Sequence, residues 1–488
     1  MQAIRWSRAS RSSEWWVALA AALGCASAAA ATVEPELAAR IARDNGMQRY
    51  PVILRLSQQA DASEIARRVS SLPQGQRGGR IVEALKAYNT PLQAPLLQDL
   101  AARKAEQVVP LLTTNAVAAH LGAKDITELA KRGELASIRY DIGLLAPSRR
   151  MMADPCRPDR PTPRQRLPKS CRSDAPTKPT MAAASFDARL PASATLQAVG
   201  APAAWQAGYT GKGITVAVVD TGIDAAHADL AGSFRGGKGD WFDVHGEHAQ
   251  PMDRHGHGTQ ITGLVVGTGA SGQTLGVAPQ ARWIAARIYN DKNVGRLSQL
   301  HRIMAWLLDP DGNSATADAP QVVLNAWGLG DRPGTCDDEF ARDLQWLRAA
   351  GMHVVFAAGN GGPMDNSSVS PANNSGVLAV GALDGNGQPA LFSSRGVSAC
   401  DARPYPDVMA PGELLRTTDL SAGGVPVTTV GTGTSYAAAV AAGELALLLQ
   451  AKPALSSAER EGLLRTVPGD ARPPLLRALS LAAPERQP

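Results

Sequence analysis

The sequence has few cysteines and almost no long apolar stretch. Its 488 residues include five cysteines, and no two of them have the Cys-x-x-Cys spacing typical of structural zinc sites. Apart from residues 15–23, we expect no stretch of the chain to span a bilayer. The sequence therefore argues against a zinc-dependent fold and against a protein with several membrane spans.

The chain also lacks a widespread excess of charge. Its formal net charge is +5, yet nine Lys or Arg residues and only three Asp residues lie between positions 149 and 178. This Pro-rich segment accounts for the whole surplus, and the rest of the chain is close to neutral. A basic linker in solvent explains that distribution better than a nucleic-acid-binding face, so we expect no nucleic-acid partner.

Residues 1–31 have the layout of a Sec-type secretory signal peptide. Three arginines precede the apolar residues 15–23, and a tract of Ala and Ser follows at 26–31. We therefore expect a secreted or periplasmic protein from which this segment is removed. An uncleaved membrane anchor is an alternative, disfavoured because the apolar run is short. Lipidation at Cys25 is another, and Ala22 fits that signal poorly.

Four cysteines remain after the signal segment. An even number of cysteines in an exported protein suggests disulfides. We expect Cys156 to pair with Cys171 within the basic segment, and Cys336 to pair with Cys400. Free thiols are the alternative.

Residues 32–144 are predicted to form a small α+β unit. The apolar spacing indicates the order β-α-β-β-α-β, a ferredoxin-like arrangement. Strands are expected at 52–56, 108–112, 117–121 and 135–140, and helices at 81–103 and 126–132. Pro91 and Pro95 should break or kink the first helix. The unit holds no catalytic grouping, and residues 145–193 follow it as a basic, Pro-rich linker.

Residues 194–480 are predicted to form an α/β domain. The β-branched run at 214–219 is typical of a parallel strand buried on both faces. Further strands are expected at 283–288, 322–325, 353–357 and 377–380, and helices at 338–350 and 435–449. The pattern predicts a doubly wound parallel sheet with helices on both faces. Such sheets bind ligands at the carboxyl ends of their strands.

Four chemically active side chains are expected at that edge. Asp220 and Asn360 each follow a strand, whereas His257 and Ser435 each stand where a helix begins. A serine hydroxyl needs a base within reach, and a histidine with a pKa near ~6.5 can serve at neutral pH. A carboxylate fixes the tautomer of that histidine, and an amide N–H can hold an oxyanion. The combination predicts attack on a carbonyl by a serine nucleophile.

The motifs around these residues resemble those of the subtilases, the subtilisin-like serine endopeptidases of peptidase family S8. The motifs occur in the order Asp220-Thr-Gly-Ile-Asp, His257-Gly-Thr, Ala357-Ala-Gly-Asn and Gly433-Thr-Ser-Tyr-Ala. Asn325-Ala-Trp-Gly is similar to the Asn-Ser-Trp-Gly of the bacillopeptidase F-like branch. Residues 32–144 resemble, more loosely, the inhibitor-like propeptide of the family.

The resemblance implies a role for each matching residue. Asp220, His257 and Ser435 would form the charge-relay group, with Asn360 as the oxyanion donor. The substrate cleft would be bordered by two runs: Ala326, Trp327 and Gly328, and then Ala357, Ala358 and Gly359. A substrate peptide would pair with the backbone there.

The resemblance also implies how the protein is made and what it acts on. It implies a self-processing precursor, with the propeptide as an intramolecular inhibitor, and a monomer that hydrolyses protein or peptide substrates. No cofactor or metal is required for the chemistry. Structural calcium is common in the family, but the sequence maps no ligand set for it.

Several positions near the site depart from the family pattern, and two of them bear on the predictions. Tyr436 stands where subtilases commonly have Met, and Gln260 where they usually have a second His. We expect Tyr436 to slow inactivation by peroxide and to narrow the leaving-group side of the cleft. The alternative is that its ring packs against the following helix.

Other enzyme classes fit the residues less well. Asp220-Thr-Gly is also the signature of aspartic proteases, which need two such carboxylates, and this chain has one. An esterase of the α/β-hydrolase type would have Gly-x-Ser-x-Gly, but position 437 is Ala. A pseudoprotease that kept the fold as a binding scaffold is the non-enzymatic alternative, and labelling of Ser435 by a fluorophosphonate probe would distinguish it.

Overall fold

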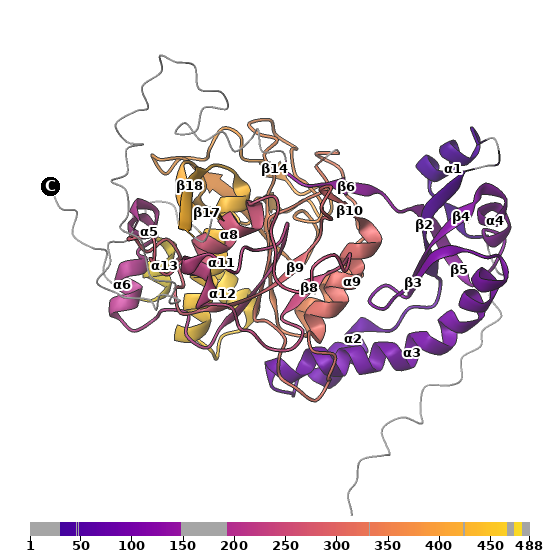
Figure 1. Cartoon of the computed structure of the whole chain (residues 1–488), viewed down its shortest axis with the longest axis horizontal. Coiled ribbons are helices and arrows are strands. Elements are labelled where there is room, and N and C mark those ends of the chain that lie inside the picture. The colour runs from indigo at the N-terminus through magenta and orange to yellow at the C-terminus, as the bar shows by residue number, and fades with distance from the viewer. Residues whose placement is uncertain are drawn as a thin grey trace, which may run out of the picture.

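The structure is a computed structural model of the whole chain, and it describes residues 30–44, 46, 48–147, 193–330, 332–422, 425–465 and 473–480. Figure 1 shows a larger domain with a smaller N-terminal unit beside it. Nearly all of the expected signal peptide, most of the expected linker and the expected Cys156–Cys171 pair lie outside the described residues.

A seven-stranded parallel sheet forms the centre of the larger domain. Its strand order is β16-β13-β12-β11-β7-β9-β8, and every neighbouring pair is parallel. The strands are β7 (Thr215–Asp220), β8 (Trp241–Asp243), β9 (Arg282–Arg287), β11 (Val322–Asn325), β12 (His353–Ala357), β13 (Leu378–Leu383) and β16 (Val408–Pro411). This is the α/β fold class that the sequence predicts.

Helices cover both faces of this sheet because its central strands are apolar on both sides. Val216 and Val218 of β7 belong to one hydrophobic cluster, which includes residues of the helices α8 (His257–Val266) and α11 (Thr434–Ala451). Ala217 and Val219 belong to a second cluster, with α9 (Leu297–Leu308) and α10 (Ala341–Ala349). Alternate residues of one strand thus face opposite layers of helices.

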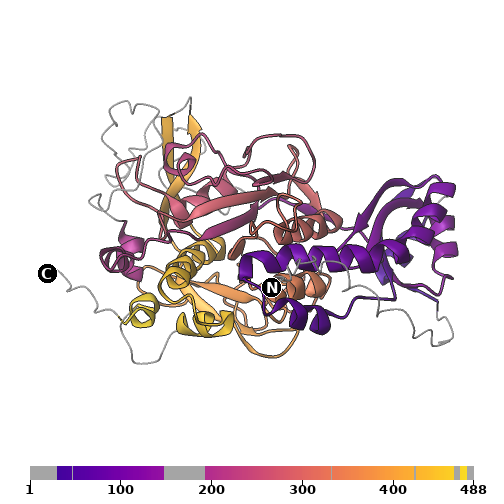
Figure 2. The ribbon, with the colours of Figure 1, turned by 90° about the horizontal axis from the view of Figure 1, so that it is seen from below.

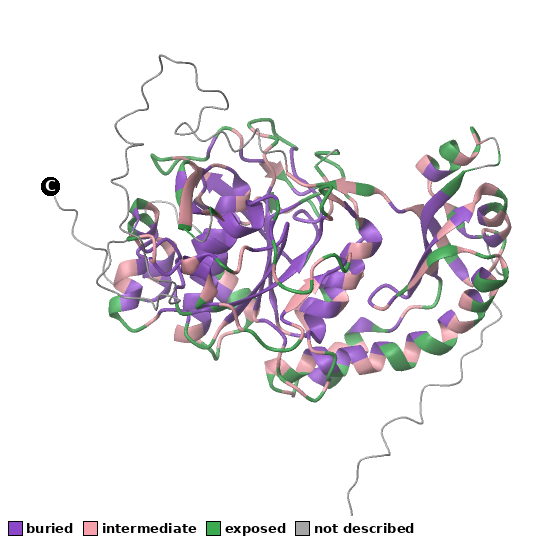
Figure 3. Cartoon of the chain, viewed as in Figure 1, coloured by how far each residue is buried: buried purple, intermediate pink, exposed green. Residues whose placement is uncertain are grey.

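The helix α11 is buried over most of its length. By length and composition it could cross a membrane, but 83% of it is buried inside the domain. Figure 3 shows the buried residues concentrated in the central sheet and in the helices packed on it. We therefore describe α11 as a core helix.

The N-terminal unit has a five-stranded sheet of order β1-β5-β2-β4-β3. Between β2 and β5 the elements follow the β-α-β-β-α-β order with one additional helix, α2. The elements are β1 (Thr32–Val33), α1 (Pro35–Ile41), β2 (Arg49–Leu56), α2 (Ala62–Val69), α3 (Gln74–Ala102), β3 (Glu106–Leu111), β4 (Ala116–Gly122), α4 (Ala123–Leu129), β5 (Leu135–Tyr140) and β6 (Gly143–Leu145).

The long helix α3 continues through two prolines that were expected to break or kink it. Pro91 and Pro95 lie inside its 29 residues. Both are exposed, and their four-residue spacing puts them on the same side of the helix. Carbonyls that lose an N–H partner there can bind water. The opposite side buries Leu85, Leu96 and Leu100, and this packing holds the helix together.

The N-terminal unit packs directly on the larger domain. Ile81 and Leu85 of α3 share a hydrophobic cluster with residues of α9 and α10. Arg55 and Arg139 form ion pairs with the buried Glu339 at 2.6 and 2.8 Å. In Figure 2 the long α3 lies across the underside of the larger domain. The two parts therefore bury apolar surface and pair charges against each other.

Shorter elements complete the larger domain. Its remaining helices are α5 (Ala194–Val199), α6 (Ala201–Gln206), α7 (Ala228–Ala231), α12 (Ser457–Leu463) and α13 (Pro474–Ala478). Three antiparallel pairs join β10 (Val294–Arg296) to β6, β14 (Gly396–Val397) to β15 (Pro404–Tyr405), and β17 (Leu415–Ala422) to β18 (Val425–Gly431).

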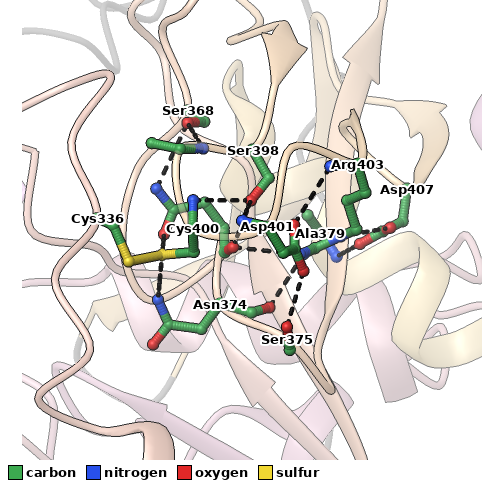
Figure 4. A network of polar contacts seen from close by, with 12 residues as sticks. Cys336, Ser368, Asn374, Ser375, Ala379, Ser398, Cys400, Asp401, Arg403 and Asp407 are labelled. Carbon is green, nitrogen blue, oxygen red and sulfur yellow. Dashed lines mark hydrogen bonds and ion pairs between the residues drawn. A yellow bond between two sulfur atoms is a disulfide. The ribbon is translucent and has the colours of Figure 1, made fainter.

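A disulfide joins Cys336 to Cys400, with their Cα atoms 4.8 Å apart. It connects the segment before α10 to the turn between β14 and β15. Figure 4 shows this bond within a network of polar contacts, in which Arg403 pairs with Asp401 at 2.6 Å and with Asp407 at 3.1 Å. The covalent bond and the ion pairs together fix this turn on the sheet.

Candidate active site

Asp220 and His257 meet at the carboxyl end of β7. Asp220 is the last residue of this strand, and His257 is the first residue of α8. The Nδ1 atom of His257 lies 2.8 Å from Oδ1 and 2.9 Å from Oδ2 of Asp220. Because a carboxylate can only accept, Nδ1 carries the proton, which leaves Nε2 of the neutral ring as an acceptor.

A glycine allows this close approach of helix and strand. A Cβ atom at Gly258 would lie 2.0 Å from the carbonyl oxygen of Gly222 and 3.2 Å from the Cβ of Asp220. Any other residue would therefore push the first turn of α8 away from the end of β7. The glycine of the His-Gly-Thr motif keeps His257 within hydrogen-bond reach of Asp220.

Asp253 fixes the turn that leads into α8. Its Oδ1 accepts from the backbone N–H groups of His255 and Gly256 at 2.8 Å, and its Oδ2 accepts from the hydroxyl of Thr259 at 2.7 Å. Thr221 donates to the same carboxylate at 3.1 Å. This residue was not expected from the sequence, although an Asp shortly before a helix is a recognised capping signal.

Asp220 and His257 lie away from solvent. Each residue is only 2% exposed. Burial alone would lower the pKa of His257, but the charge of Asp220 and their hydrogen bond outweigh burial and raise that pKa above its ordinary value. The ring therefore accepts a proton more readily than free imidazole does.

Ser435 lies at the start of α11, beside this pair. It is the second residue of the helix and is half-buried. Its hydroxyl donates to the carbonyl oxygen of Ala326 at 3.1 Å. The ring of the next residue, Tyr436, stands edge-on to that of His257, with centroids 6.2 Å apart. A rotation of the Ser435 side chain would be needed to direct its proton to another acceptor.

Asn360 faces the same helix start. Its Oδ1 accepts from the backbone N–H of Thr434 at 2.9 Å and from the Thr434 hydroxyl at 3.0 Å. With the oxygen held in this way, the amide NH₂ must point to the other side. A Cβ atom at Gly433 would lie 3.5 Å from Nδ2 of Asn360. The NH₂ group of Asn360 therefore lies close to the backbone just before Ser435.

Two residues of the run 326–328 border a cavity of about 410 Å³. Trp327 and Gly328 line it, opposite residues 142–145 of the N-terminal unit. The Trp327 ring packs edge-on to Phe340 and Phe356, so it also belongs to the core beneath the cavity. Ala326 is buried and supplies the carbonyl that receives the Ser435 hydroxyl.

The backbone groups of residues 357–359 form hydrogen bonds within the domain. Ala357 pairs with Val380 in the sheet, and Ala358 accepts from the Tyr405 hydroxyl at 2.5 Å. Gly359 donates to the Thr434 hydroxyl at 3.1 Å and accepts from Ser394. None of Ala357, Ala358 and Gly359 lines the cavity. Their described contacts position Asn360 rather than leave a free edge for another chain.

The end of the N-terminal unit reaches the site as an added strand. β6 pairs antiparallel with β10, in the register Leu145 to Val294 and Gly143 to Arg296. Ala146 extends the pairing by donating to the Asn293 carbonyl at 3.0 Å. The expected boundary between the α+β unit and the linker, at 144/145, falls within this strand. Its pairing with a strand about 150 residues away leaves no local trace in the sequence.

Tyr436 is buried beneath the site. It is 1% exposed, and its hydroxyl donates to Oε1 of Gln260 at 2.6 Å. A Cβ atom at Gly431 would lie 2.0 Å from the Tyr436 ring, which is therefore covered by the end of β18. The expectation that this ring narrows the leaving-group side of the cleft is wrong, because the ring packs inside the domain.

Comparison with known proteins agrees with the resemblance of the sequence motifs. The family model described as the subtilase family matches residues 211–477. Bacillopeptidase F of Bacillus subtilis (strain 168) is 36% identical over 288 residues, which cover 54% of this chain and 19% of that protein. Serine protease AprX of the same organism is 34% identical over 279 residues, covering 52% of this chain and 61% of AprX. Subtilisin of Bacillus pumilus is 32% identical over 268 residues, covering 54% of this chain and 86% of that protein. The chain thus spans about a fifth of the first relative and about three fifths of the second.

Proposed function

The chain belongs to the subtilase family of serine endopeptidases, and on that premise we propose that it hydrolyses internal peptide bonds of proteins or peptides through Ser435. The hydrogen bond between His257 and Asp220 at 2.8–2.9 Å is the observation that carries the proposal. It leaves Nε2 of a buried imidazole as the proton acceptor, at the end of the sheet where α11 begins.

In the proposed reaction, the Ser435 hydroxyl turns from Ala326 toward Nε2 of His257. Its oxygen attacks the carbonyl carbon of the scissile bond while His257 takes the proton. Asp220 stabilises the imidazolium that forms. His257 then donates the proton to the leaving amine, and a water molecule hydrolyses the acyl-enzyme by the same sequence of transfers.

The negative oxygen of the tetrahedral intermediate needs donors that are already in place. We assign this role to Nδ2 of Asn360 and to the backbone N–H of Ser435. This N–H lies in the first turn of α11, where N–H groups have no carbonyl partner within the helix. The two bonds from Thr434 that hold the Asn360 oxygen support this assignment, since they fix the direction of the NH₂ group. The chemistry requires no cofactor.

We further propose that residues 32–144 act as a propeptide. The pairing of β6 with β10 supports this, because an extended segment beside the cavity occupies the place of a substrate. The shared hydrophobic packing of α3 with α9 and α10 supports a role in folding. The protein would be exported as a monomeric precursor, would cut itself within residues 145–193, and would be inhibited until then.

The test is expression of the wild type and of Ser435→Ala in a host that lacks other exported proteases. The wild type should yield a mature form that hydrolyses peptides, and Ser435→Ala should accumulate uncut precursor without activity. Lys212→Gln, a change at an exposed residue just before β7, serves as a control that should still be processed. Normal maturation of Ser435→Ala would refute self-processing, and normal hydrolysis by it would refute the assignment of the nucleophile.

A further inference from the structure

Two carboxylates beside the cavity hold an arginine of the N-terminal unit. Both Nη atoms of Arg139 contact Asp337, at 2.9 and 2.6 Å, and Nη1 also lies 2.8 Å from Oε2 of Glu339. We propose that these carboxylates form a substrate subsite of the mature enzyme, which recognises an arginine far ahead of the scissile bond. This inference rests on the proposed function, because it requires that the N-terminal unit leave the larger domain.

Residues 139–147 follow one continuous path along the larger domain. The carbonyl oxygen of Asp141 accepts from Arg296 at 2.9 Å, and that of Ile142 accepts from the N–H of Leu297 at 3.3 Å. β6 then pairs with β10 and leads toward the proposed catalytic residues. These contacts use the backbone of the N-terminal unit, so a chain of another sequence can make them. A substrate that lies along β10 as β6 does would bring an upstream side chain to the two carboxylates.

The geometry of this site suits a guanidinium group. Two nitrogen atoms of Arg139 face the two oxygens of Asp337, which is the paired arrangement that arginine forms with carboxylates. With the N-terminal unit in place, the side chain of Asp337 is 22% exposed and that of Glu339 is 2% exposed. Burial would raise the pKa of Asp337, but its hydrogen bond with Arg139 and the charge of that residue lower it below its ordinary value. The carboxylate is therefore ionised and ready to pair with a cation.

Loss of the N-terminal unit would leave these carboxylates short of cations. Arg139 is the only cationic side chain paired with Asp337 among the described residues, and Glu339 would lose Arg55 as well as Arg139. Glu339 would keep His301, whose Nε2 lies 2.9 Å away. A shielded carboxylate that has lost its partner costs free energy. An arginine supplied by a substrate would recover part of that cost.

Arg332 is another cation on the wall of the same cavity, which Asp337 also lines. Arg332 pairs with Glu36 of the N-terminal unit at 3.1 Å, and its side chain is 53% exposed. An exposed arginine is screened by solvent and loses side-chain entropy when it is fixed, so a pair between Arg332 and Asp337 would be weak. The two carboxylates would therefore remain available to a substrate.

The experiment compares two acetylated peptides as inhibitors of the mature enzyme. Both have the sequence of residues 138–147, but at the position of Arg139 one carries arginine and the other citrulline, which has nearly the same shape without the charge. The assay is hydrolysis of a short chromogenic peptide that does not extend to the carboxylates. The arginine peptide should have an inhibition constant about three- to tenfold lower at low ionic strength. The ratio should shrink at high ionic strength, because salt screens the pair.

Asp337→Asn should remove the difference between the two peptides, because the amide keeps the shape of the carboxylate and loses its charge. Asp338→Asn is the matched control: it neutralises the exposed carboxylate next in the chain and should preserve the difference. Both variants should hydrolyse the short peptide as the wild type does.

Equal inhibition of the wild type by the two peptides, or inhibition by neither, would overturn the inference. A difference that persists in Asp337→Asn would also overturn it, since the arginine would then bind elsewhere. Hydrolysis of the short peptide tests the proposed function separately. If the mature protein fails to hydrolyse it, the proposed function is refuted and this subsite with it, whereas hydrolysis without discrimination between the peptides refutes the subsite alone.

Discussion

Pro147 and His255 are joined by a hydrogen bond of 2.8 Å between the Pro147 carbonyl oxygen and Nε2 of His255. Pro147 is the last described residue before position 193, and His255 stands two residues before His257. The N-terminal unit is therefore attached to the turn that carries the imidazole, and not only to the outer helices.

We expect His255→Ala to loosen this attachment. One hydrogen bond contributes about 0.5–1.5 kcal/mol, which corresponds to roughly a two- to twelvefold change in an opening equilibrium. Amide hydrogen exchange of the full-length Ser435→Ala protein should therefore accelerate by that factor at Ala146 and in β6, when His255→Ala is added. Exchange within β2 and β4 serves as the internal control and should not change.

Asn360→Ala should lower kcat by about 10²–10³ with little change in KM, because the lost donor acts on the oxyanion and not on the bound substrate. Steady-state hydrolysis of a peptide substrate by the mature enzyme measures both constants. Thr434→Val is the companion variant: it removes the hydroxyl that holds the Asn360 oxygen and should give a smaller loss of kcat. An increase of KM alone in Asn360→Ala would contradict the proposed role.

The pH dependence of kcat/KM should reflect the raised pKa of His257. The ring can accept the serine proton only when it is neutral, so activity is lost below its pKa and rises as pH climbs through it. Because that pKa lies above the ordinary value, the rising limb should be centred above pH ~6.5, with a plateau at alkaline pH. An activity maximum in the acidic range would contradict a histidine base.

Tyr436→Phe should destabilise the protein by about 1–3 kcal/mol, because it leaves the buried Oε1 of Gln260 without its donor. Denaturant unfolding of the Ser435→Ala form measures the difference. Gln260→Leu removes the same bond and also the 3.2 Å bond from Gln260 Nε2 to Asp419, so the double variant should lose less stability than the sum of the two single variants. The peroxide prediction also remains: Tyr436→Met should be inactivated faster than wild type, and equal rates would refute it.

The sequence predicts the central strands well because they are buried on both faces. β11 and β12 begin and end at the expected residues, since short β-branched runs are bounded there by polar or small residues. The strands β8 and β16 were not anticipated. They have three and four residues, and their Trp-Phe-Asp and Val-Met-Ala-Pro sequences carry no clear alternation.

The features missed at the site depend on contacts between distant segments. Asp253 acts through hydrogen bonds to a turn whose shape the sequence does not specify. β6 is recognisable only with β10 beside it. Because Tyr436 follows Ser435 in the sequence, it was predicted to line the cleft. Successive residues of a helix point in different directions, however, and here the ring points into the core.

The central claim is that Ser435 is the nucleophile activated by His257 and Asp220. The most direct measurement is labelling of the mature protein with a fluorophosphonate probe, followed by peptide mass spectrometry, with His257→Ala as the comparison. The account predicts one label per active molecule, located on Ser435, and strongly reduced labelling in His257→Ala. Absence of label in correctly folded mature protein, or stoichiometric label on another residue, would contradict it.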